Sequence, residues 1–307
     1  MSEAEVLDFS GDADGLYDLW LAAAAERPWE TRKTIDRFTG KYLEDPFQRN
    51  GFILTAVDEK HTAGAALVSL IPEMRRAVMR LWVLPERQRK GLGARLLKET
   101  TARLKEQGQW RLECEPVPFC PGYNAFFKAK GFKPDALYPG GFLMRRGIDG
   151  ITGPGAVKGC EIVRVGRIEK SEYFDRDANV EIGYSGGQKI DLEERKNEML
   201  ATMADSLSHC YSLAVDGEHV LGFSRSAIVE NAAGELQLRN RGLIVSQEAR
   251  GSGIGRALLD DNLAWGKEEG VSMAYISTHS TNPAKRLYER AGYEVVETLE
   301  NLVCHFG

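Results

Sequence analysis

The sequence predicts an α/β (α+β) protein built from two tandem copies of one fold, each a mixed sheet flanked by helices. The first observation is an internal repeat, because three glycines of the first half recur in the second half at almost one offset. The second is that both halves show the same order of helix and strand patterns around a glycine-rich segment. The repeated glycines are Gly91 and Gly253 (162 residues apart), Gly108 and Gly270 (162), and Gly131 and Gly292 (161). An offset as long as a domain indicates two domains rather than a solenoid.

The length of 307 residues is enough for two domains with a sizeable core in each. An apolar content of 43% and a charged content of 28% are typical of soluble globular proteins. The acidic start, MSEAEVLDFSGDADG, is unlike a secretory signal, and no stretch approaches the roughly 18 unbroken apolar residues of a membrane helix. The five cysteines are scattered and lack metal-ligand spacing. We therefore expect a cytoplasmic protein with reduced thiols, no metal and no membrane partner.

Charge is unevenly divided between the halves. Residues 1–150 carry a net charge of +2 and residues 151–307 one of −7. Since the sequence has no basic block or stripe, we expect no nucleic-acid partner. The acidic second half favours a cationic small substrate, although a solvated acidic surface explains the same charge. We expect a monomer or a homodimer.

The first copy shows its elements in a clear order. Apolar residues three and four positions apart predict helices, and apolar runs bounded by polar turns predict strands. The elements expected are helices over 12–26 and 29–43, strands over 52–57, 63–71 and 77–84, a helix over 94–107, a strand over 110–115, a short helix ending near Lys130, and a closing strand over 141–146.

The second copy repeats this order. The elements expected are a helix over 191–207, strands over 211–215, 219–229 and 235–245, a helix over 257–269, a strand over 272–278 and a helix over 283–291. The segment 145–159 is rich in glycine and has no apolar periodicity. The domain boundaries expected are therefore an N-terminal domain over 1–147, a linker over 148–159 and a C-terminal domain over 160–307.

The glycine segments, RQRKGLGARLL at 87–97 and ARGSGIGRALL at 249–259, lie between a strand and a helix. The first amides of a helix have no internal partner and carry partial positive charge, so they form an anion site. Alternate glycines let phosphate oxygens approach the backbone closely. The spacing fits neither the dinucleotide fingerprint nor the nucleotide P-loop. A pyrophosphate of another kind is the expected guest.

The pattern is Gln88-x-x-Gly91-x-Gly93 in one copy and Arg250-x-x-Gly253-x-Gly255 in the other, each after an apolar strand. It resembles the pyrophosphate loop of the GNAT superfamily of acetyl-CoA-dependent N-acyltransferases. The downstream segment NPAKRLYERAGY also resembles that family's N-x-A-x-x-L-Y-x-x-x-G-F/Y segment. The resemblance covers both halves and implies two tandem GNAT domains, each with a mixed, mostly antiparallel twisted sheet.

The resemblance implies acetyl-CoA as the cofactor and assigns residues to it. In this family the strand before the loop separates from its neighbour and binds the pantetheine arm, while the loop amides bind the pyrophosphate. The strand residues implied are Leu243, Ile244 and Val245 in the second copy, and Leu81, Trp82 and Val83 in the first. The loop residues implied are Arg250, Gly251, Ser252, Gly253, Ile254, Gly255 and Arg256, and Gln88, Arg89, Lys90, Gly91, Leu92, Gly93 and Ala94. Asn282 is implied to contact the cofactor from the far side.

The resemblance makes Tyr288 the first candidate for catalysis, as the acid that protonates the departing thiolate. A phenol suits this role because it is neutral and able to donate at pH 7. A buried tyrosine that only packs on the core is the alternative. The first copy has Phe127 at this position, which has no proton to give, and Tyr123 is a weaker substitute. We therefore expect chemistry in the C-terminal domain and a non-catalytic N-terminal domain.

The general base is less well defined. The positions where family members often carry a glutamate are Arg239 and Arg241 here, so that role is not transferred. Glu235, further back on the strand, and His279, after the strand 272–278, are the candidates. Ordered water can also remove the proton of the amine. The two arginines, alternating along one strand, are alternatively a site for an anionic group of the substrate.

The function expected is acetyl transfer to a primary amine of a small molecule by direct attack on the thioester, with binding geometry supplying much of the rate. A protein amino group is the second substrate class. The alternative outside enzymes is an acyl-CoA-binding regulatory or assembly protein.

Overall fold

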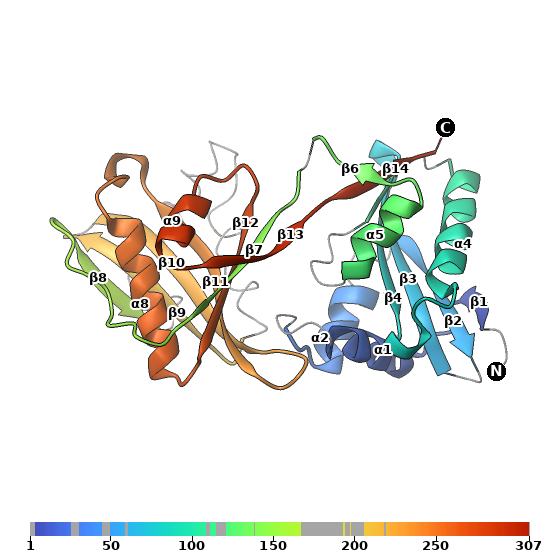
Figure 1. The fold of residues 1–307 in the computed structure, drawn as a ribbon, viewed down its shortest axis with the longest axis horizontal. Helices are drawn as coiled ribbons and strands as arrows, with labels where there is room; N and C mark the ends of the chain where they lie inside the picture. The colour runs from blue at the N-terminus through green and yellow to red at the C-terminus, as the bar shows by residue number, and fades with distance from the viewer. Residues whose placement is uncertain are drawn as a thin grey trace. The chain divides into compact units, whose positions relative to one another are not determined.

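The computed structural model describes residues 4–25, 31–44, 50–58, 61–108, 111–114, 121–137, 139–166, 193, 197, 206–217 and 219–306. The chain divides into two compact units (Figure 1). Unit 1 comprises Met1–Gly141 and Glu297–Gly307, and unit 2 comprises Phe142–Val296. Each unit is built on a seven-stranded mixed sheet with helices packed on it, which confirms the predicted fold class.

Unit 1 has the strand order β1-β2-β3-β4-β5-β14-β6, in which only the pair β4–β5 is parallel. Its strands are β1 (Glu5–Asp8), β2 (Gly51–Asp58), β3 (His61–Ile71), β4 (Arg76–Val83), β5 (Arg111–Cys114), β6 (Lys133–Pro134) and β14 (Leu302–His305). Its helices are α1 (Ala13–Ala25), α2 (Ile35–Thr39) with a π-helical turn over Gly40–Glu44, α4 (Leu92–Glu106) and α5 (Pro121–Ala129). The predicted helix over 29–43 is thus shorter than expected.

Unit 2 has the strand order β13-β7-β12-β11-β10-β9-β8. Its strands are β7 (Gly141–Gly147), β8 (Glu161–Val165), β9 (Ser208–Asp216), β10 (His219–Glu230), β11 (Leu236–Val245), β12 (Met273–His279) and β13 (Glu294–Leu299). Its helices are α8 (Ile254–Glu268) and α9 (Lys285–Arg290). The pairs β8–β9, β9–β10 and β10–β11 are antiparallel and the pair β11–β12 is parallel. Most of the predicted helix over 191–207 lies outside the described residues.

The helix after each glycine segment packs on the sheet of its own unit. In α4, Leu96, Leu97 and Leu104 are buried at helical spacing and join the core of unit 1. In α8, Leu259 and Leu263 do the same in unit 2. These apolar faces fix the helix on the sheet, so its N-terminus always faces the end of the preceding strand.

The other face of the sheet in unit 1 is covered by α1 and α2 through an aromatic cluster. The ring centroid of Trp82 in β4 lies 6.0 Å from that of Phe38 and 5.2 Å from that of Tyr42. The ring centroid of Phe38 lies 5.5 Å from that of Trp20. Since side chains alternate along a strand, the neighbouring Leu81 faces the α4 side. The two residues that precede the glycine loop thus anchor β4 to both layers of unit 1.

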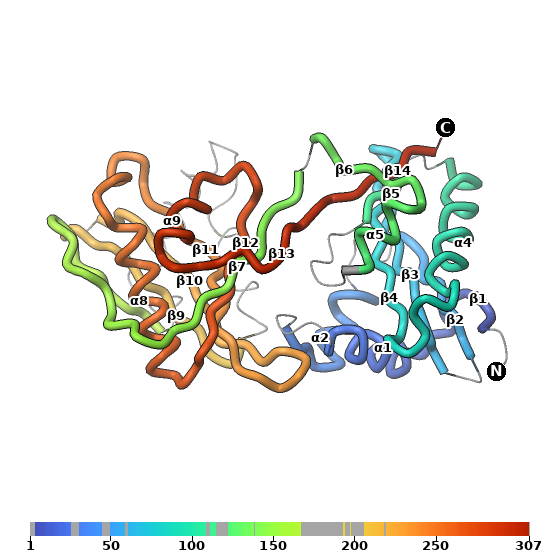
Figure 2. The backbone as a smooth tube through the Cα atoms, viewed as in Figure 1, coloured from blue at the N-terminus to red at the C-terminus, as the bar shows by residue number. Residues whose placement is uncertain are grey.

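The closing strands are exchanged between the two sheets, which differs from the expected domain boundaries. The strand over 141–146, predicted to close the first domain, is β7 and lies between β13 and β12 of unit 2. The last strand of the chain, β14, lies between β5 and β6 of unit 1 (Figure 2). Strand periodicity predicts that a segment is extended, but it does not specify the partner, because the pairing residues are distant in sequence.

Polar contacts hold β14 in its place. Leu302 pairs with Cys114, and the amide of Asp135 donates to the carbonyl of Asn301 over 2.8 Å. On β5, Arg111 bonds both Glu113 and Asp135 at 2.6 Å. The segment that ends the chain is therefore an integral part of the core of unit 1.

Four cysteines in the described part of the chain are free thiols: Cys114, Cys160, Cys210 and Cys304. Burial raises the pKa of Cys114, and it raises the pKa of Cys210 to about 12. These two thiols are therefore protonated at neutral pH. None of the helices in the described ranges is long and apolar enough to cross a membrane.

We predict that Leu302→Ala destabilises unit 1 although this residue lies at the end of the chain. Leu302 is 1% exposed in the core of unit 1, so truncation should lower the free energy of unfolding by about 2–4 kcal/mol. Amide hydrogen exchange in β3 and β10 reports the two units separately, and β3 should lose protection. Val295→Ala, which truncates a 41% exposed side chain, is the control. Equal protection of the β3 amides in both variants would contradict the placement of β14 in the sheet of unit 1.

Candidate functional site

The candidate site in unit 2 begins where two parallel strands separate. The ladder between β11 and β12 runs from Leu238 opposite Ala274 to Asn240 opposite Ile276 and then stops. Residues 243–245 remain paired with β10 on the other edge. Their backbone groups on the β12 side therefore have no strand partner, which leaves an extended edge open to a ligand.

Unit 1 has the same pair of parallel strands before its glycine segment. The ladder between β4 and β5 runs as far as Met79 opposite Cys114, the last described residue of β5, and Arg80–Val83 continue to pair with β3. In unit 2, the strand segment 243–245 predicted from the sequence lies immediately beyond the last parallel pair.

A β-bulge precedes the opening in unit 2. Arg225 pairs with Gly242 and Ser226 with Asn240, so Arg241 is the extra residue. The bulge breaks the regular alternation that would place Arg239 and Arg241 on one face. Arg239 instead lies with its guanidinium carbon 5.1 Å from the ring of Tyr275. The bulge therefore interrupts the alternation on which the expected pair of arginines rested.

Left-handed glycines turn each strand end into the following helix. Gly91 (φ 85°) and Gly253 (φ 94°) are the N-cap residues of α4 and α8. Gly251 also has a positive φ of 83°, whereas its counterpart in unit 1 is Arg89, with φ 61°. A left-handed conformation costs a non-glycine residue about 1–2 kcal/mol. The backbone turn is conserved between the units even where the glycine is not.

These turns leave the first helical amides without a backbone acceptor. Among the described residues, the amides of Leu92, Gly93 and Ala94 donate to no backbone carbonyl, and the same holds for Ile254 and Gly255. The amide of Arg256 differs, because it donates to the carbonyl of Gly253 over 3.0 Å. Both helix N-termini therefore present aligned donors of the kind that bind phosphate.

The long side chains of the loops contact protein atoms. The Gln88 amide donates to the carbonyl of Val83 over 3.4 Å, and Nε of Arg250 donates to that of Val245 over 3.2 Å. The same position therefore braces the loop against the preceding strand in both units. Lys90 donates to the carbonyl of Glu86 over 2.8 Å.

Ser252 and Arg256 also bond within the protein. Ser252 donates to the carbonyl of Ala249 over 2.6 Å. Arg256 bonds Asp260 over 2.6 Å and the carbonyl of Arg290 over 2.9 Å. The side chains shape the loop, and the backbone supplies its exposed donors.

Unit 1 has a cavity of about 310 Å³ at its loop. Its lining includes all the predicted cofactor residues of the first copy except Lys90. The residues that the sequence did not single out for a site are Ala23 of α1, Arg87, and Gly122, Phe126 and Lys130 of α5 or its end. Tyr123, the weaker substitute acid predicted from the sequence, lines the cavity too. The helical spacing of Tyr123, Phe126 and Lys130 was the signal for a shared face.

Tyr288 lies in α9, a helix of six residues, and is 5% exposed. Its ring centroid lies 6.1 Å from that of Tyr293, whose pKa is raised by burial. The helix packs against the glycine loop, because a Cβ added to Gly255 would lie 3.3 Å from Leu287. Tyr288 is thus carried by an element that contacts the glycine turn before α8.

Asn282 lies in the turn that precedes α9. Its side-chain oxygen accepts from the backbone amide of Ala284 over 2.9 Å, and its backbone amide donates to the carbonyl of His279 over 3.0 Å. One role of Asn282 is therefore to shape the connection between β12 and α9. Its side-chain NH₂ group is the part suited to a ligand.

The two candidate bases lie at opposite ends of the strand pair. His279 is exposed at the end of β12, and the ends of parallel strands share one sheet edge with Val245. Glu235 precedes β11, about 25 Å along the strand from Leu243 at 3.3 Å per residue. Its carboxylate accepts from the side chain of Asn231 over 2.9 Å. The structure brings His279 to the opening and leaves Glu235 away from it.

Phe127 takes the position of Tyr288 in unit 1. It is fully buried, with ring centroids 4.7 Å from Tyr123 and 5.0 Å from both Phe126 and Phe132. The position is therefore filled by a packed aromatic group without a donor. Unit 1 therefore has a cavity at its glycine loop, but the residue at the Tyr288 position has no hydroxyl group.

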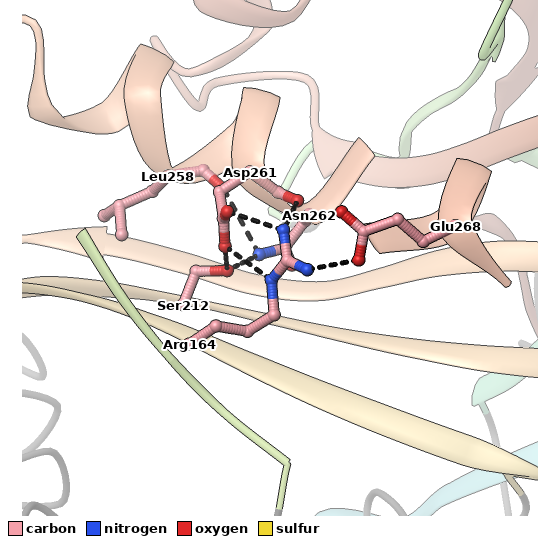
Figure 3. Close-up of polar contacts among 6 residues, drawn as sticks. All are labelled: Arg164, Ser212, Leu258, Asp261, Asn262 and Glu268. Carbon is pink, nitrogen blue, oxygen red and sulfur yellow. Dashed lines mark hydrogen bonds and ion pairs between the residues drawn. The ribbon is translucent and has the colours of Figure 1, made fainter. Parts of the chain in front are cut away.

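A buried polar network fixes α8, and with it the glycine loop of unit 2 (Figure 3). Asp261 is 8% exposed at its side chain and accepts from Arg164 of β8 over 2.7 Å. It also accepts from Ser212 of β9 over 2.5 Å. Asn262 donates to the same serine and to the carbonyl of Leu258. The hydrogen bond with Asp261 raises the pKa of Arg164, so its guanidinium stays charged over the physiological range.

Comparison with known proteins finds two acetyltransferase domains in the chain. The model of the acetyltransferase (GNAT) family matches residues 14–132, and that of the acetyltransferase (GNAT) domain matches residues 206–295. Together the two matches cover well over half of the sequence. No curated protein sequence matches the chain significantly.

Solved structures share the fold over the whole chain. A tandem GNAT protein from the clavulanic acid biosynthesis pathway is similar with a TM-score of 0.75 and 19% identity, over 99% of both chains. A GCN5-related N-acetyltransferase from Sphaerobacter thermophilus gives 0.63 and 19%, over 98% of this chain and 95% of that one. A glucosamine N-acetyltransferase region of a fungal multi-domain β-N-acetylglucosaminidase gives 0.61 and 18%, over 99% of this chain and 38% of that one. At these identities the likeness concerns the fold.

Arg164 forms one ion pair with the buried carboxylate of Asp261 and another with the exposed carboxylate of Glu268, so the two contributions to stability can be compared. We predict that Asp261→Asn lowers the free energy of unfolding by about 2–4 kcal/mol, because it removes the buried charge partner of a partly buried guanidinium. Glu268→Gln removes the exposed partner of the same arginine and should cost less than about 1 kcal/mol. Urea unfolding of both variants is the measurement. Equal losses would show that burial does not distinguish the two pairs.

Proposed function

Because the chain belongs to the GNAT acetyltransferase family, with one domain in each half, we propose that it transfers the acetyl group of acetyl-CoA to a primary amine of a small molecule. The observation that carries the proposal is the strand opening of unit 2, which lies next to a helix N-terminus with exposed amides and to the helix of Tyr288. Unit 2 thus holds both the backbone amides that could bind an anion and a phenol that could protonate a leaving group.

The residues present fit acetyl-CoA. The amides of Ile254 and Gly255 would hold the pyrophosphate, since they are aligned and have no internal acceptor. The open edge at 243–245 would hold the pantetheine arm through backbone hydrogen bonds. A bound acetyl-CoA supplies a thioester, whose carbonyl carbon an amine can attack directly.

The protein's own groups then have three tasks. The site orients a neutral amine toward the carbonyl carbon, which removes much of the entropic part of the barrier. Tyr288 gives its phenolic proton to the sulfur as the carbon–sulfur bond breaks. His279, or water in its place, takes the surplus proton of the amine as the carbon–nitrogen bond forms. Glu235 is the less suitable base because of its distance along β11.

The two units would differ in role. We propose that unit 2 carries out the transfer, while unit 1 binds the cofactor in its cavity of about 310 Å³ without turning it over. Phe127 supports this division, because it replaces the proton donor with a hydrocarbon ring. The competing function is that of a regulatory or assembly protein that binds acyl-CoA without transferring the acyl group, and release of free thiol in the presence of amines distinguishes the two.

The acceptor is proposed by class only. The fungal region similar in fold is called a glucosamine N-acetyltransferase, so an amino sugar is the first acceptor to test, followed by a polyamine and an amino acid. A protein amino group is the second class. We propose the cytoplasm as the compartment, a monomer or homodimer as the assembly, and no nucleic-acid or membrane partner.

We predict that Tyr288→Phe lowers kcat about 100-fold, because a positioned general acid contributes that much or more. The affinity for acetyl-CoA should change less than twofold, since the variant keeps the ring. Release of free thiol from acetyl-CoA with a panel of primary amines is the measurement. Tyr293→Phe removes a neighbouring buried hydroxyl and serves as the control. An unchanged kcat in Tyr288→Phe would remove this residue from the mechanism.

Calorimetric titration of acetyl-CoA tests how many loops bind. We predict two sites in the wild type, one lost in Gly253→Glu and the other in Gly91→Glu, because each glutamate places negative charge in a phosphate loop. Gly253→Gln and Gly91→Gln share the backbone strain of a positive φ without the charge, and they are the matched controls. A single site lost only in Gly253→Glu would make unit 1 a structural partner. No binding in the wild type would overturn the proposed function.

A further inference from the structure

The helix that carries Tyr288 is too short to be stable alone. A six-residue helix has few internal hydrogen bonds, and isolated helices shorter than about 12 residues are marginal in water. Its position must therefore come from contacts with other elements. The last carbonyls of a helix are the groups most in need of such contacts.

Two arginines from separate elements bond these carbonyls. Arg256, in the first turn of α8, donates from Nη1 to the carbonyl of Arg290 over 2.9 Å. Arg146, on the exchanged strand β7, donates from Nη1 to the carbonyl of Ala291. Positive charge at a helix C-terminus also interacts favourably with the helix dipole. Both guanidinium groups thus lie at the one end of α9 where they stabilise it most.

The surroundings keep each arginine in place. Asp260 binds Nε of Arg256 at 2.6 Å, which directs the other end of the guanidinium toward α9. A Cβ added to Gly292 would lie 3.5 Å from Nε of Arg146, so the guanidinium of Arg146 packs on the turn that ends α9. The side chain of Arg256 is 43% exposed, but its Nε and Nη1 atoms are both bonded to protein atoms.

The first copy supplies an internal comparison. The residue after Gly93 is Ala94, where the second copy has Arg256 after Gly255. The half without a tyrosine therefore also lacks this arginine. The correlation links the arginine to the use of the helix rather than to the fold, since both units form the fold.

We propose that Arg146 and Arg256 are positioning residues that clamp the end of α9 and hold Tyr288 against the cofactor loop. This arginine clamp rests on the proposed role of Tyr288 as the acid. Because Arg256 belongs to the first turn of α8, the clamp ties the phenol to the same turn that binds the pyrophosphate. Arg146 ties it to a strand contributed by the first half of the sequence.

A double-mutant cycle tests the clamp. Arg146→Met and Arg256→Ala, the latter copying Ala94, should each lower kcat about tenfold in the wild-type background. In the Tyr288→Phe background the same changes should alter kcat less than twofold, because residues that act through one group are not additive. Arg146→Lys, which keeps one donor, should recover part of the loss. Glu289→Gln removes an exposed ion pair on the same helix and is the matched control.

Amide hydrogen exchange over residues 285–291 separates positioning from misfolding. In both arginine variants the amides of residues 285–291 should exchange faster than in the wild type, and the exchange rates over β9 and β10 should stay the same. Glu289→Gln should resemble the wild type in both regions. Losses of kcat that are equal in both backgrounds, or exchange that stays unchanged over 285–291, would overturn the clamp. A wild type that releases no thiol from acetyl-CoA with any amine would overturn the proposed function instead, and the exchange result would still decide whether the arginines hold the helix.

Discussion

The candidate site of unit 2 depends on a parallel strand pair that forms hydrogen bonds over only part of its length. Where the ladder between β11 and β12 ends, the backbone of residues 243–245 has no strand partner on the β12 side. A buried backbone edge must find other partners, so this opening determines where a ligand can lie. The left-handed Gly253 and the exposed amides of α8 follow directly behind it.

The remaining structure holds two helices at fixed positions around this opening. The ion pair of Asp261 with Arg164 and its bond to Ser212 anchor α8 to β8 and β9. The contact between Gly255 and Leu287 sets α9 against the loop. Polar side chains of β8 and β9 thus hold α8 on the sheet of unit 2.

The duplication has diverged in its chemistry more than in its backbone. Both units turn the chain at the same place, and Gln88 and Arg250 brace that turn through the same carbonyl position. Arg89 even adopts the left-handed conformation of Gly251. The differences are concentrated in the helix downstream, where Phe127 packs among aromatic rings and Tyr288 carries a phenol. The backbone turn is thus retained in both copies, while a phenolic hydroxyl stands at this downstream position in only one of them.

The sequence by itself determined the duplication, the mixed sheets and the two glycine loops, because these depend on local periodicity and on backbone conformations that glycine favours. It also brought the strand ends and the loop of unit 1 into one candidate site. Only the tertiary structure decided the partners of the closing strands, since β7 and β14 pair with residues more than a hundred positions away. The tertiary structure also placed His279 and Glu235 at opposite ends of the strand pair β11–β12, and it placed Arg146 at the end of α9. Such pairings arise from packing between distant segments, which no local pattern specifies.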